Sequence, residues 1–190
     1  MARKKKTTVD SDEFHGGWEL GGNAHAIAAT ELEWGIMRFS AAFERTCLQL
    51  GGISGSGDLA FQELLLLHVV AMQRHPQTAI SLARQLNRDD VANLQYSLRK
   101  LLKDELIVKI KEPRGKTYTY DLSEQGAKRV SHYARIRNKL LTNKTSMIED
   151  VDAKMEQATQ LISLLTGIYD DVARASATYT SIDSSDALPD

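Results

Sequence analysis

Residues 78–122 change the spacing of their apolar side chains more than once, and these changes limit the possible fold more than any other feature of the chain. A short stretch at helical spacing is followed by a polar break and a longer amphipathic stretch. Two runs that alternate apolar and polar residues come next, joined by a basic turn. Because helices repeat roughly every 3.6 residues and strands every two, this order predicts helix, turn, helix and β-hairpin.

The first helix of this stretch is predicted to begin after Thr78, whose hydroxyl can accept a hydrogen bond from an otherwise unpaired backbone N–H. Asn87 can end this helix or cap the next one, and Asp90, three residues on, gives the segment some likeness to a capping box. The positions that we expect to be buried are Ile80, Leu82, Ala83 and Leu86.

The second helix, at about residues 89–104, is predicted to have one apolar and one polar face. The apolar face consists of Val91, Leu94, Leu98, Leu101 and Leu102. The polar face presents Asn93, Gln95, Tyr96, Arg99, Lys100 and Lys103. Asn and Gln side chains pair with adenine edges, and arginine pairs with guanine or a phosphate, so this face is a candidate for DNA readout.

Two runs of alternating residues, at 108–111 and 117–122, flank the turn Pro113-Arg114-Gly115 and predict a β-hairpin. Arg114 and Lys116 lie at its tip, where they could reach phosphates or the minor groove. Together with the two helices, the hairpin predicts a winged helix-turn-helix. Such a domain presents one helix to the DNA major groove and its wing to the flanking backbone.

The formal net charge of the chain is −1, but the positive charge is concentrated on the predicted winged helix. Residues 74–116 contain ten Lys or Arg and five Asp or Glu, whereas the segments on either side each carry a net charge of −3. The alternative is chance clustering. The coincidence of the basic island with the motif favours a nucleic-acid surface.

A long helix is predicted at residues 24–50, where apolar side chains recur every three or four positions and form one buried stripe. The stripe consists of Leu32, Ile36, Phe39, Phe43, Cys47 and Leu50. Gly51 and Gly52 are expected to end this helix, before a Gly/Ser loop that runs to Gly57. A further helix near residues 58–73 should share one apolar face and end at His75-Pro76. That face consists of Phe61, Leu64, Leu65, His68 and Met72.

Two helices are predicted after the hairpin, one from Ser123 to about Leu141 and one at roughly 146–175. The second carries a heptad seam, the usual pattern of helices that pack along their length. The seam consists of Val151, Met155, Ala158, Ile162, Leu165, Tyr169 and Val172. It could be satisfied within one chain, but its distance from the winged helix favours a dimer interface.

The remaining features exclude several classes of protein. No stretch approaches the length of a membrane span, and the basic run Arg3–Lys6 is not followed by the apolar core of a signal peptide. That run could enter a DNA groove or, as such runs more often do, remain a solvated tail. The single cysteine, Cys47, excludes an internal disulfide and suits the cytoplasm.

Single residues give little sign of catalysis or metal binding. No two of the five histidines have a metal-ligand spacing, and the glycines at 51–57 lack the lysine and preceding strand of a phosphate-binding loop. We therefore expect no enzyme, no metal and no cofactor.

Cys47 could sense oxidation, but its place on the apolar stripe favours a buried structural thiol. Trp34, Phe39, Phe43 and Phe61 could line an effector cavity, although plain core is the better interpretation.

The order of the predicted elements resembles the MarR family of bacterial transcription regulators over about residues 24–175. The strongest likeness runs from Val91-Ala92-Asn93 through Leu101-Leu102-Lys103-Asp104-Glu105-Leu106-Ile107-Val108, and on through the wing to Leu122-Ser123-Glu124-Gln125-Gly126. Glu105 replaces a glycine that is usual in this family, so the end of the recognition helix is expected to differ. The wing is short, and of the family's wing arginines only Arg114 carries over.

The resemblance implies a homodimer whose first, fifth and sixth helices intertwine and whose two recognition helices enter successive major grooves. It also implies repression that is relieved by a small molecule or by oxidation. Asp89 and Asp90 stand at the start of the recognition helix, where carboxylates favour the helix dipole but repel phosphate. The alternatives for these two residues are to cap the helix, to accept from a cytosine amino group, or to make the affinity for DNA modest.

We therefore expect a mainly α fold with a small β-hairpin wing, in which a winged helix-turn-helix is flanked by long dimerisation helices. The predicted parts are a disordered tail (1–22), a dimerisation helix and loop (24–57), the winged-helix lobe (58–122), C-terminal dimerisation helices (123–176) and a disordered acidic tail (181–190). Bases would be read by Asn93, Gln95, Tyr96 and Arg99. The DNA backbone would be contacted by Arg84, Lys100, Lys103, Arg114 and Lys116. The expected partners are double-stranded DNA, a second copy of the chain and a small-molecule effector, with no membrane. The alternative is a winged-helix protein-interaction module with little affinity for DNA.

Overall fold

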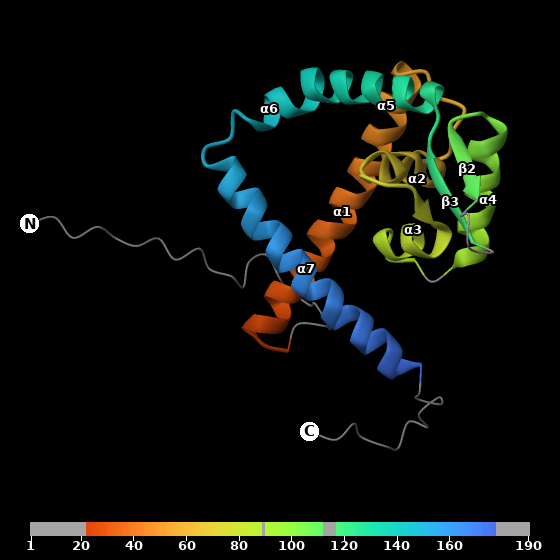
Figure 1. The fold of residues 1–190 in the computed structure, drawn as a ribbon. Coiled ribbons are helices and arrows are strands. Elements are labelled where there is room, and N and C mark those ends of the chain that lie inside the picture. Colours follow the sequence, from red (N-terminus) through yellow and green to blue (C-terminus); the bar gives the residue numbers. More distant parts are fainter. Residues whose placement is uncertain (1–21, 89, 112–116, 178–190) are drawn as a thin grey trace, which may run out of the picture. The chain divides into compact units, whose positions relative to one another are not determined.

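The computed structural model describes residues 22–88, 90–111 and 117–177, and these residues form a mainly helical fold with one small antiparallel sheet (Figure 1). This confirms the predicted fold class. The chain divides into two compact units, the first ending at Ala134 and the second beginning at Arg135. Both predicted disordered tails, apart from Gly22, lie outside the described residues, as do Asp89 and the wing tip from Glu112 to Lys116.

Helix α1 (Ala24–Ile53) begins at Asn23, whose side chain accepts a hydrogen bond of 2.9 Å from the Ala26 N–H. The predicted end at the glycine pair is wrong, because the helix continues through both glycines to Ile53. Gly51 is buried against α2, and a Cβ there would lie 3.1 Å from a methyl group of Leu64. This glycine therefore lets two helices approach closely instead of ending one of them.

The apolar stripe of α1 is only partly buried, so the prediction of one continuous buried face is wrong for the single chain. Cys47 and Leu50 are buried near the end of the helix, whereas Phe39 is 70% exposed. The other exposed members of the stripe are Leu32, Ile36 and Phe43. The exposed part of the stripe is an apolar surface that the single chain does not cover.

Helix α2 (Phe61–Ala71) lies at the centre of the first unit and packs against α1, α3, α4 and β3. The prediction of a single apolar face is wrong, because a helix with neighbours on several sides is buried nearly all round. Its buried apolar residues are Leu64, Leu66, Leu67, Val69 and Val70. Met72, which we expected on that face, follows the helix and is 71% exposed.

The sheet has three strands in the order β1-β3-β2, and both pairings are antiparallel. Strands β2 (Ile107–Lys111) and β3 (Tyr118–Leu122) confirm the predicted hairpin. Strand β1 (Gln77–Thr78) was not predicted, since two residues are too short to show a periodic pattern. Because β1 pairs with β3, the wing is joined to the residues that precede α3.

The core of the first unit is a cluster of leucines that belongs to several elements of the winged helix. Helices α3 (Ala79–Gln85) and α4 (Val91–Lys103) contribute to it together with α2 and the residue that precedes β2. Burial of each such side chain stabilises the fold by roughly 1.5–3 kcal/mol. The fully buried side chains are Leu64, Leu66, Leu67, Leu82, Leu94, Leu98, Leu101 and Leu106.

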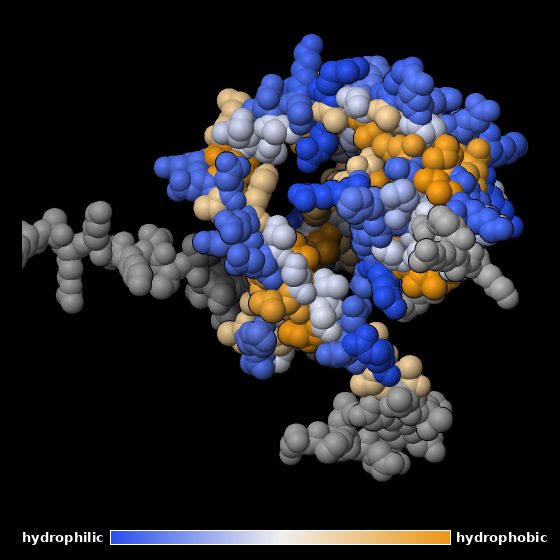
Figure 2. Space-filling model, viewed as in Figure 1, coloured by the Kyte–Doolittle hydropathy of each residue, from blue (hydrophilic) through white to orange (hydrophobic). Residues whose placement is uncertain are grey.

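The second unit consists of helices without a core of their own. It begins in the last turn of α5 (Glu124–Arg137), most of which belongs to the first unit. Helix α5 passes into a π-helical turn, η2 (Asn138–Thr142), and then into α6 (Asn143–Thr145), so the regular helix ends before the predicted Leu141. Helix α7 (Val151–Ser176) follows. Between residues 135 and 177, all of which are described, no residue is buried. Apolar side chains are exposed among polar ones along α7 (Figure 2).

Candidate nucleic-acid interface

Helix α4 is the predicted recognition helix, and its apolar residues fix it firmly in the domain. Leu94, Leu98 and Leu101 are each 0% exposed. At its beginning, the Asp90 carboxylate accepts a hydrogen bond of 3.0 Å from the Asn93 N–H, which makes Asp90 the N-cap. Of the predicted buried face, Val91 is exposed, because it lies in the first turn at the edge of the packed surface.

The turn before α4 is built from a helix end with a left-handed residue. Thr78 caps the beginning of α3, as predicted, by accepting from the Ser81 N–H at 3.2 Å. Asn87 has a φ of 49° and ends α3, which decides between its two predicted roles. The Arg88 N–H then donates to the Ala83 carbonyl at 3.0 Å, a bond typical of the Schellman motif.

The end of α4 has the same geometry, so the expectation that Glu105 would alter it is wrong. Glu105 has a φ of 55° and thus adopts the left-handed conformation that glycine would. Its N–H donates to the Leu102 carbonyl, and the Leu106 N–H donates to the Leu101 carbonyl at 2.9 Å. These are the two bonds of a Schellman motif, and the chain turns directly from it into β2.

Burial also tests the predicted positions on α3. Leu82 and Ala83 are buried, and Leu86 is half-buried. Ile80, however, is 59% exposed, so its predicted burial is wrong. With only seven residues, α3 presents a narrow face to the core, and the first turn of this short helix leaves Ile80 on the surface.

The exposed face of α4 has an open groove with a volume of about 570 Å³. The groove is lined by Tyr96, Arg99, Lys100, Lys103 and Asp104. Tyr96 is 62% exposed, and its ring is available for contact with a ligand. The structure thus brings together four of the predicted DNA-contacting residues on one surface.

Two other residues that are predicted to read bases lie near this face but differ in their surroundings. Asn93 is exposed, and its side-chain amide donates a hydrogen bond to the Asp90 carboxylate. Because a carboxylate can only accept, the amide nitrogen faces Asp90 and the amide oxygen is directed elsewhere. Gln95 is half-buried on the same helix.

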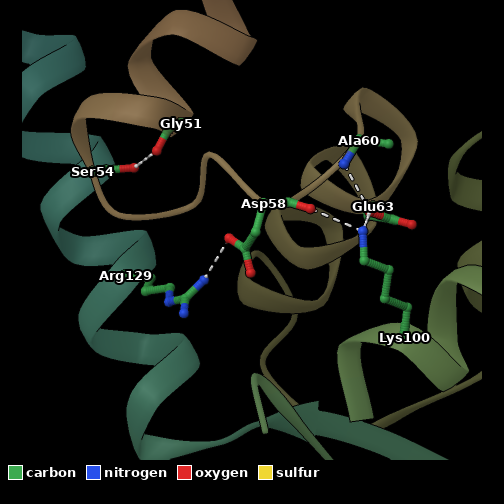
Figure 3. A network of polar contacts seen from close by, with 7 residues as sticks. All are labelled: Gly51, Ser54, Asp58, Ala60, Glu63, Lys100 and Arg129. Atoms are coloured by element: carbon green, nitrogen blue, oxygen red, sulfur yellow. Dashed lines mark hydrogen bonds and ion pairs between the residues drawn. The ribbon is translucent and has the colours of Figure 1, made fainter. Parts of the chain in front are cut away.

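Lys100 takes part in a network of polar contacts within the domain (Figure 3). Its ammonium donates to a carboxylate oxygen of Glu63 at 2.6 Å and to the Asp58 carbonyl at 2.9 Å. The hydrogen bond to Glu63 raises the pKa of Lys100 above its usual value, so this side chain is charged at neutral pH. The same Glu63 oxygen accepts from the Ala60 N–H at 2.7 Å and so caps the beginning of α2.

Asp58 joins this network to α5, because its carboxylate accepts from Arg129 at 3.2 Å (Figure 3). Sequence reasoning did not identify Asp58, Glu63 or Arg129. The signal that could have found Glu63 is a single carboxylate inside a mostly apolar helix, since such a charge requires a partner when it is buried. The partner itself is far away in sequence and could not be identified from the pattern.

The described part of the wing also carries cationic side chains. The Lys109 ammonium lies 3.9 Å from the centroid of the Tyr118 ring, a cation–π contact between paired strands. Arg84 is exposed on α3. The predicted contacts Arg114 and Lys116 belong to the tip, which lies outside the described residues.

The structure also shows the surroundings of Cys47 and of the aromatic residues that could line a cavity. Cys47 is buried, as the structural interpretation predicts. Phe43 stacks on Phe39 and meets the Phe61 ring edge-on, with centroids 6.2 and 6.0 Å apart. Among the residues of known placement, no three His, Cys, Asp or Glu side chains are grouped so that they could hold a metal ion. None of the described helices combines the length and apolar character that crossing a membrane requires.

The fold and the exposed basic helix define the class of this protein. Residues 59–126 match the family described as the winged helix DNA-binding domain. The match covers α2, α3, α4 and the sheet, and it ends in the first turn of α5.

The fold is also similar to that of solved MarR-family transcription regulators, as the sequence resemblance indicated. It is similar to Staphylococcus aureus MarR in complex with salicylate and kanamycin, with 12% identity, a TM-score of 0.61 and coverage of 76% of this chain and 94% of that one. It is also similar to the regulator BldR of Sulfolobus solfataricus, with 14% identity, a TM-score of 0.60 and coverage of 72% and 95%.

A third similar structure is the organohalide-sensing transcriptional regulator RdhR in its ligand-free form. It has 19% identity and a TM-score of 0.58, and the match covers 89% of this chain and 99% of that one. No curated protein matches the sequence. The similarity to these structures therefore shows the fold alone.

Proposed function

We propose that this protein is a dimeric, sequence-specific DNA-binding transcription regulator of the MarR type, a cytoplasmic repressor whose affinity for DNA is modulated by a small ligand. The observation that carries the proposal is the exposed polar and basic face of α4 within a winged-helix domain. A helix held by buried leucines, with cations and hydrogen-bonding side chains facing outwards, suits entry into a major groove.

The proposed readers of bases are the side chains that the sequence indicated on α4, namely Asn93, Gln95, Tyr96 and Arg99. Contacts to phosphates are assigned to Arg84 and Lys103, which are exposed, and to Arg114 and Lys116 of the wing tip. Lys100 was predicted to join them. Its ammonium is instead bonded to Glu63 and Asp58, and we leave it out of the proposed DNA contacts.

Dimerisation is supported by two apolar surfaces that the single chain leaves exposed. One is the stripe of α1 and the other is the heptad seam of α7, where Ile162 is 48% and Val172 58% exposed. A second unit without buried residues cannot gain much stability from its own packing. A second copy of the chain would supply the missing apolar contacts along α7.

Modulation by a small ligand is supported only by the proteins that share the fold. Salicylate and kanamycin accompany one of them, and another is described as organohalide-sensing. The exposed aromatic residues of α1, among them Phe39 and Phe43, offer apolar and aromatic contacts of the kind that ligand sites use.

The test is fluorescence anisotropy with a duplex from upstream of the protein's own gene, against a scrambled duplex, over a series of salt concentrations. We expect tight binding to the first duplex and an affinity that falls steeply with salt, because phosphate contacts release counterions. Equal, weak binding to both duplexes would contradict autoregulation and place the operator elsewhere. No binding to either duplex at low salt would overturn the proposed function.

A second candidate function is a winged-helix protein-interaction module. The observation that favours it is the Asp90 carboxylate, which caps α4 at the end that would approach DNA and would repel phosphates. This candidate predicts a dimer that lacks salt-dependent affinity for any duplex. The same salt series therefore distinguishes the two functions.

A further inference from the structure

We infer that Lys100 is a positioning residue of the recognition helix and not a contact to the DNA backbone, although it lies on the basic face of α4. This inference rests on the proposed function. It assigns to the contacts among Lys100, Glu63 and Asp58 the role of fixing the orientation in which α4 presents its exposed face to DNA.

The first reason is the burial of Glu63. This residue is 4% exposed and stands among the buried apolar side chains of α2. Its carboxylate receives hydrogen bonds from the Ala60 N–H and the Lys100 ammonium, and the ammonium is its cationic partner. A buried carboxylate that loses its cation is strongly destabilised, so Glu63 requires Lys100 to remain in place.

The second reason is the geometry of the ammonium itself. Lys100 directs two of its three N–H groups into the domain, one to Glu63 and one to the carbonyl of Asp58 (Figure 3). While these two bonds are kept, only the third N–H could reach a phosphate in the groove of α4. A paired lysine also adds little to the release of counterions, because its charge is already compensated by Glu63.

The third reason is the place of Asp58 between two helices. Its main-chain carbonyl accepts from Lys100 on α4, while its carboxylate accepts from Arg129 on α5 (Figure 3). The loop before α2 thus connects the last turn of the recognition helix to α5. Buried leucines hold α4 from one side, and this polar connection adds a directional restraint that apolar contacts lack.

Lys103 provides a matched control on the same helix. It is also a lysine on the groove-lining face, three residues further on, and it is exposed. If Lys103 contacts a phosphate, its removal should make the dependence of log affinity on log salt less steep by about 0.9. A positioning residue should weaken binding without changing that slope.

The experiment compares Lys100→Met and Lys103→Met, both in the full chain. Affinity is measured by fluorescence anisotropy for a duplex that the unaltered protein selects from a randomised pool, over a series of salt concentrations. We expect Lys100→Met to lose affinity by the same factor at every salt concentration. We expect Lys103→Met to show the shallower slope. A slope that falls by about 0.9 in Lys100→Met would overturn the positioning role.

The double variant Glu63→Gln/Lys100→Met keeps the test decisive if Lys100→Met alone does not fold. It removes both charges, and the new amide oxygen can still accept from the Ala60 N–H. We expect it to bind the selected duplex more weakly than the unaltered protein, because the restraint on α4 is gone, and to keep the salt slope of the unaltered protein. A double variant that binds as tightly as the unaltered protein would show that α4 does not need the contacts of Lys100, and a shallower slope would show that DNA requires its charge. Either result would overturn the inference.

The proposed function and the inference fail in different ways. If the unaltered protein shows no salt-dependent affinity for any selected duplex, the proposed function fails, and the positioning role fails with it. If the unaltered protein binds and Lys100→Met behaves like Lys103→Met, only the positioning role fails.

Discussion

Glu105 occupies a backbone conformation that glycine adopts more readily than any residue with a side chain. Its φ of 55° costs roughly 1 kcal/mol for a residue that is neither glycine, asparagine nor aspartate. The side chain is exposed, whereas the N–H and carbonyl of the residue form the bonds that end α4 and join it to Ser123. The strain is therefore caused by the side chain, and the hydrogen bonds of the Glu105 N–H and carbonyl would remain if the side chain were removed.

Glu105→Gly is accordingly expected to stabilise the protein by about 1 kcal/mol, because glycine adopts the left-handed region without a steric penalty. The measurement is the midpoint of urea unfolding, followed by circular dichroism. Asn87→Gly is the control, since asparagine tolerates a similar φ of 49° and should gain less. A decrease in stability for Glu105→Gly would show that its side chain makes contacts worth more than the strain.

Gly126 is needed for a different reason, because two backbone segments approach each other closely at this position. A Cβ at this position would lie 2.0 Å from the Leu106 carbonyl oxygen, in a place where the first turn of α5 meets the beginning of the hairpin. We expect Gly126→Ala to destabilise the protein by about 1–3 kcal/mol or more, because backbone atoms would have to move apart. Thermal unfolding would measure the effect.

The matched control for Gly126→Ala is Gly52→Ala in α1. A Cβ there would meet nothing within 4 Å, and the residue is helical. Alanine should therefore stabilise the protein by about 0.5–1 kcal/mol at this site. If the two substitutions had equal effects, the close contact between Gly126 and Leu106 would not be a property of the folded protein in solution.

At the scale of elements, the sequence predicts helices and hairpin well where one face is apolar and the neighbouring segments are polar. The hairpin at 107–122 and helix α4 are of this kind. The prediction is poor where burial depends on neighbours that are distant in sequence. Helix α2 is buried on several sides, and the glycines of α1 lie inside a helix, because other elements pack against them.

Prediction of the candidate site from the sequence has the same limit. The exposed side chains Tyr96, Arg99 and Lys103 could be predicted from the period of α4 alone. The hydrogen bonds of Lys100 could not be predicted in this way, because its partners Glu63 and Asp58 come from another helix and a loop. Local pattern identifies which side chains face away from a helix's own core. It does not show which of them a distant segment already binds.

The recognition helix and the wing should respond differently to the loss of an arginine. We expect Arg99→Ala to cost about 1–3 kcal/mol on the preferred duplex and to alter sequence preference, because this side chain is assigned to a base. Arg114→Ala should weaken binding to all sequences about equally and reduce the salt slope by about 1, since a wing arginine would contact phosphate.

The measurement for both arginines is selection from a randomised duplex pool, combined with anisotropy over a series of salt concentrations. Arg45→Ala in α1, which is exposed and outside the apolar stripe, provides a control that should change neither property. If both variants bind like the unaltered protein, the DNA-contacting surface lies elsewhere on the molecule.

For the whole molecule, the decisive property is its oligomeric state. We expect the unaltered protein to be a dimer and Ile162→Glu to be largely monomeric, because a carboxylate in the seam of α7 would have to be buried without a partner. Sedimentation velocity at micromolar concentration would measure both. Ile162 is 48% exposed in the single chain, so the substitution should be tolerated by the monomer.

The control for this substitution is Gln160→Glu, which introduces the same charge on the opposite face of α7 and should leave the dimer intact. A dimer that survives Ile162→Glu would exclude the seam as the interface. A monomeric unaltered protein would exclude dimerisation itself and leave the apolar stripes of α1 and α7 without an explanation.

The way in which α4 is held has a consequence for how such proteins diverge. Buried leucines and the bonds of Lys100 fix the helix. Its exposed side chains Asn93, Tyr96 and Arg99 therefore do not contribute to the core. Selection for a new operator and selection for a stable fold would therefore act on separate positions. A duplicated gene could retarget its product by exchanging a few surface residues, and an engineer could randomise the same few without rebuilding the scaffold.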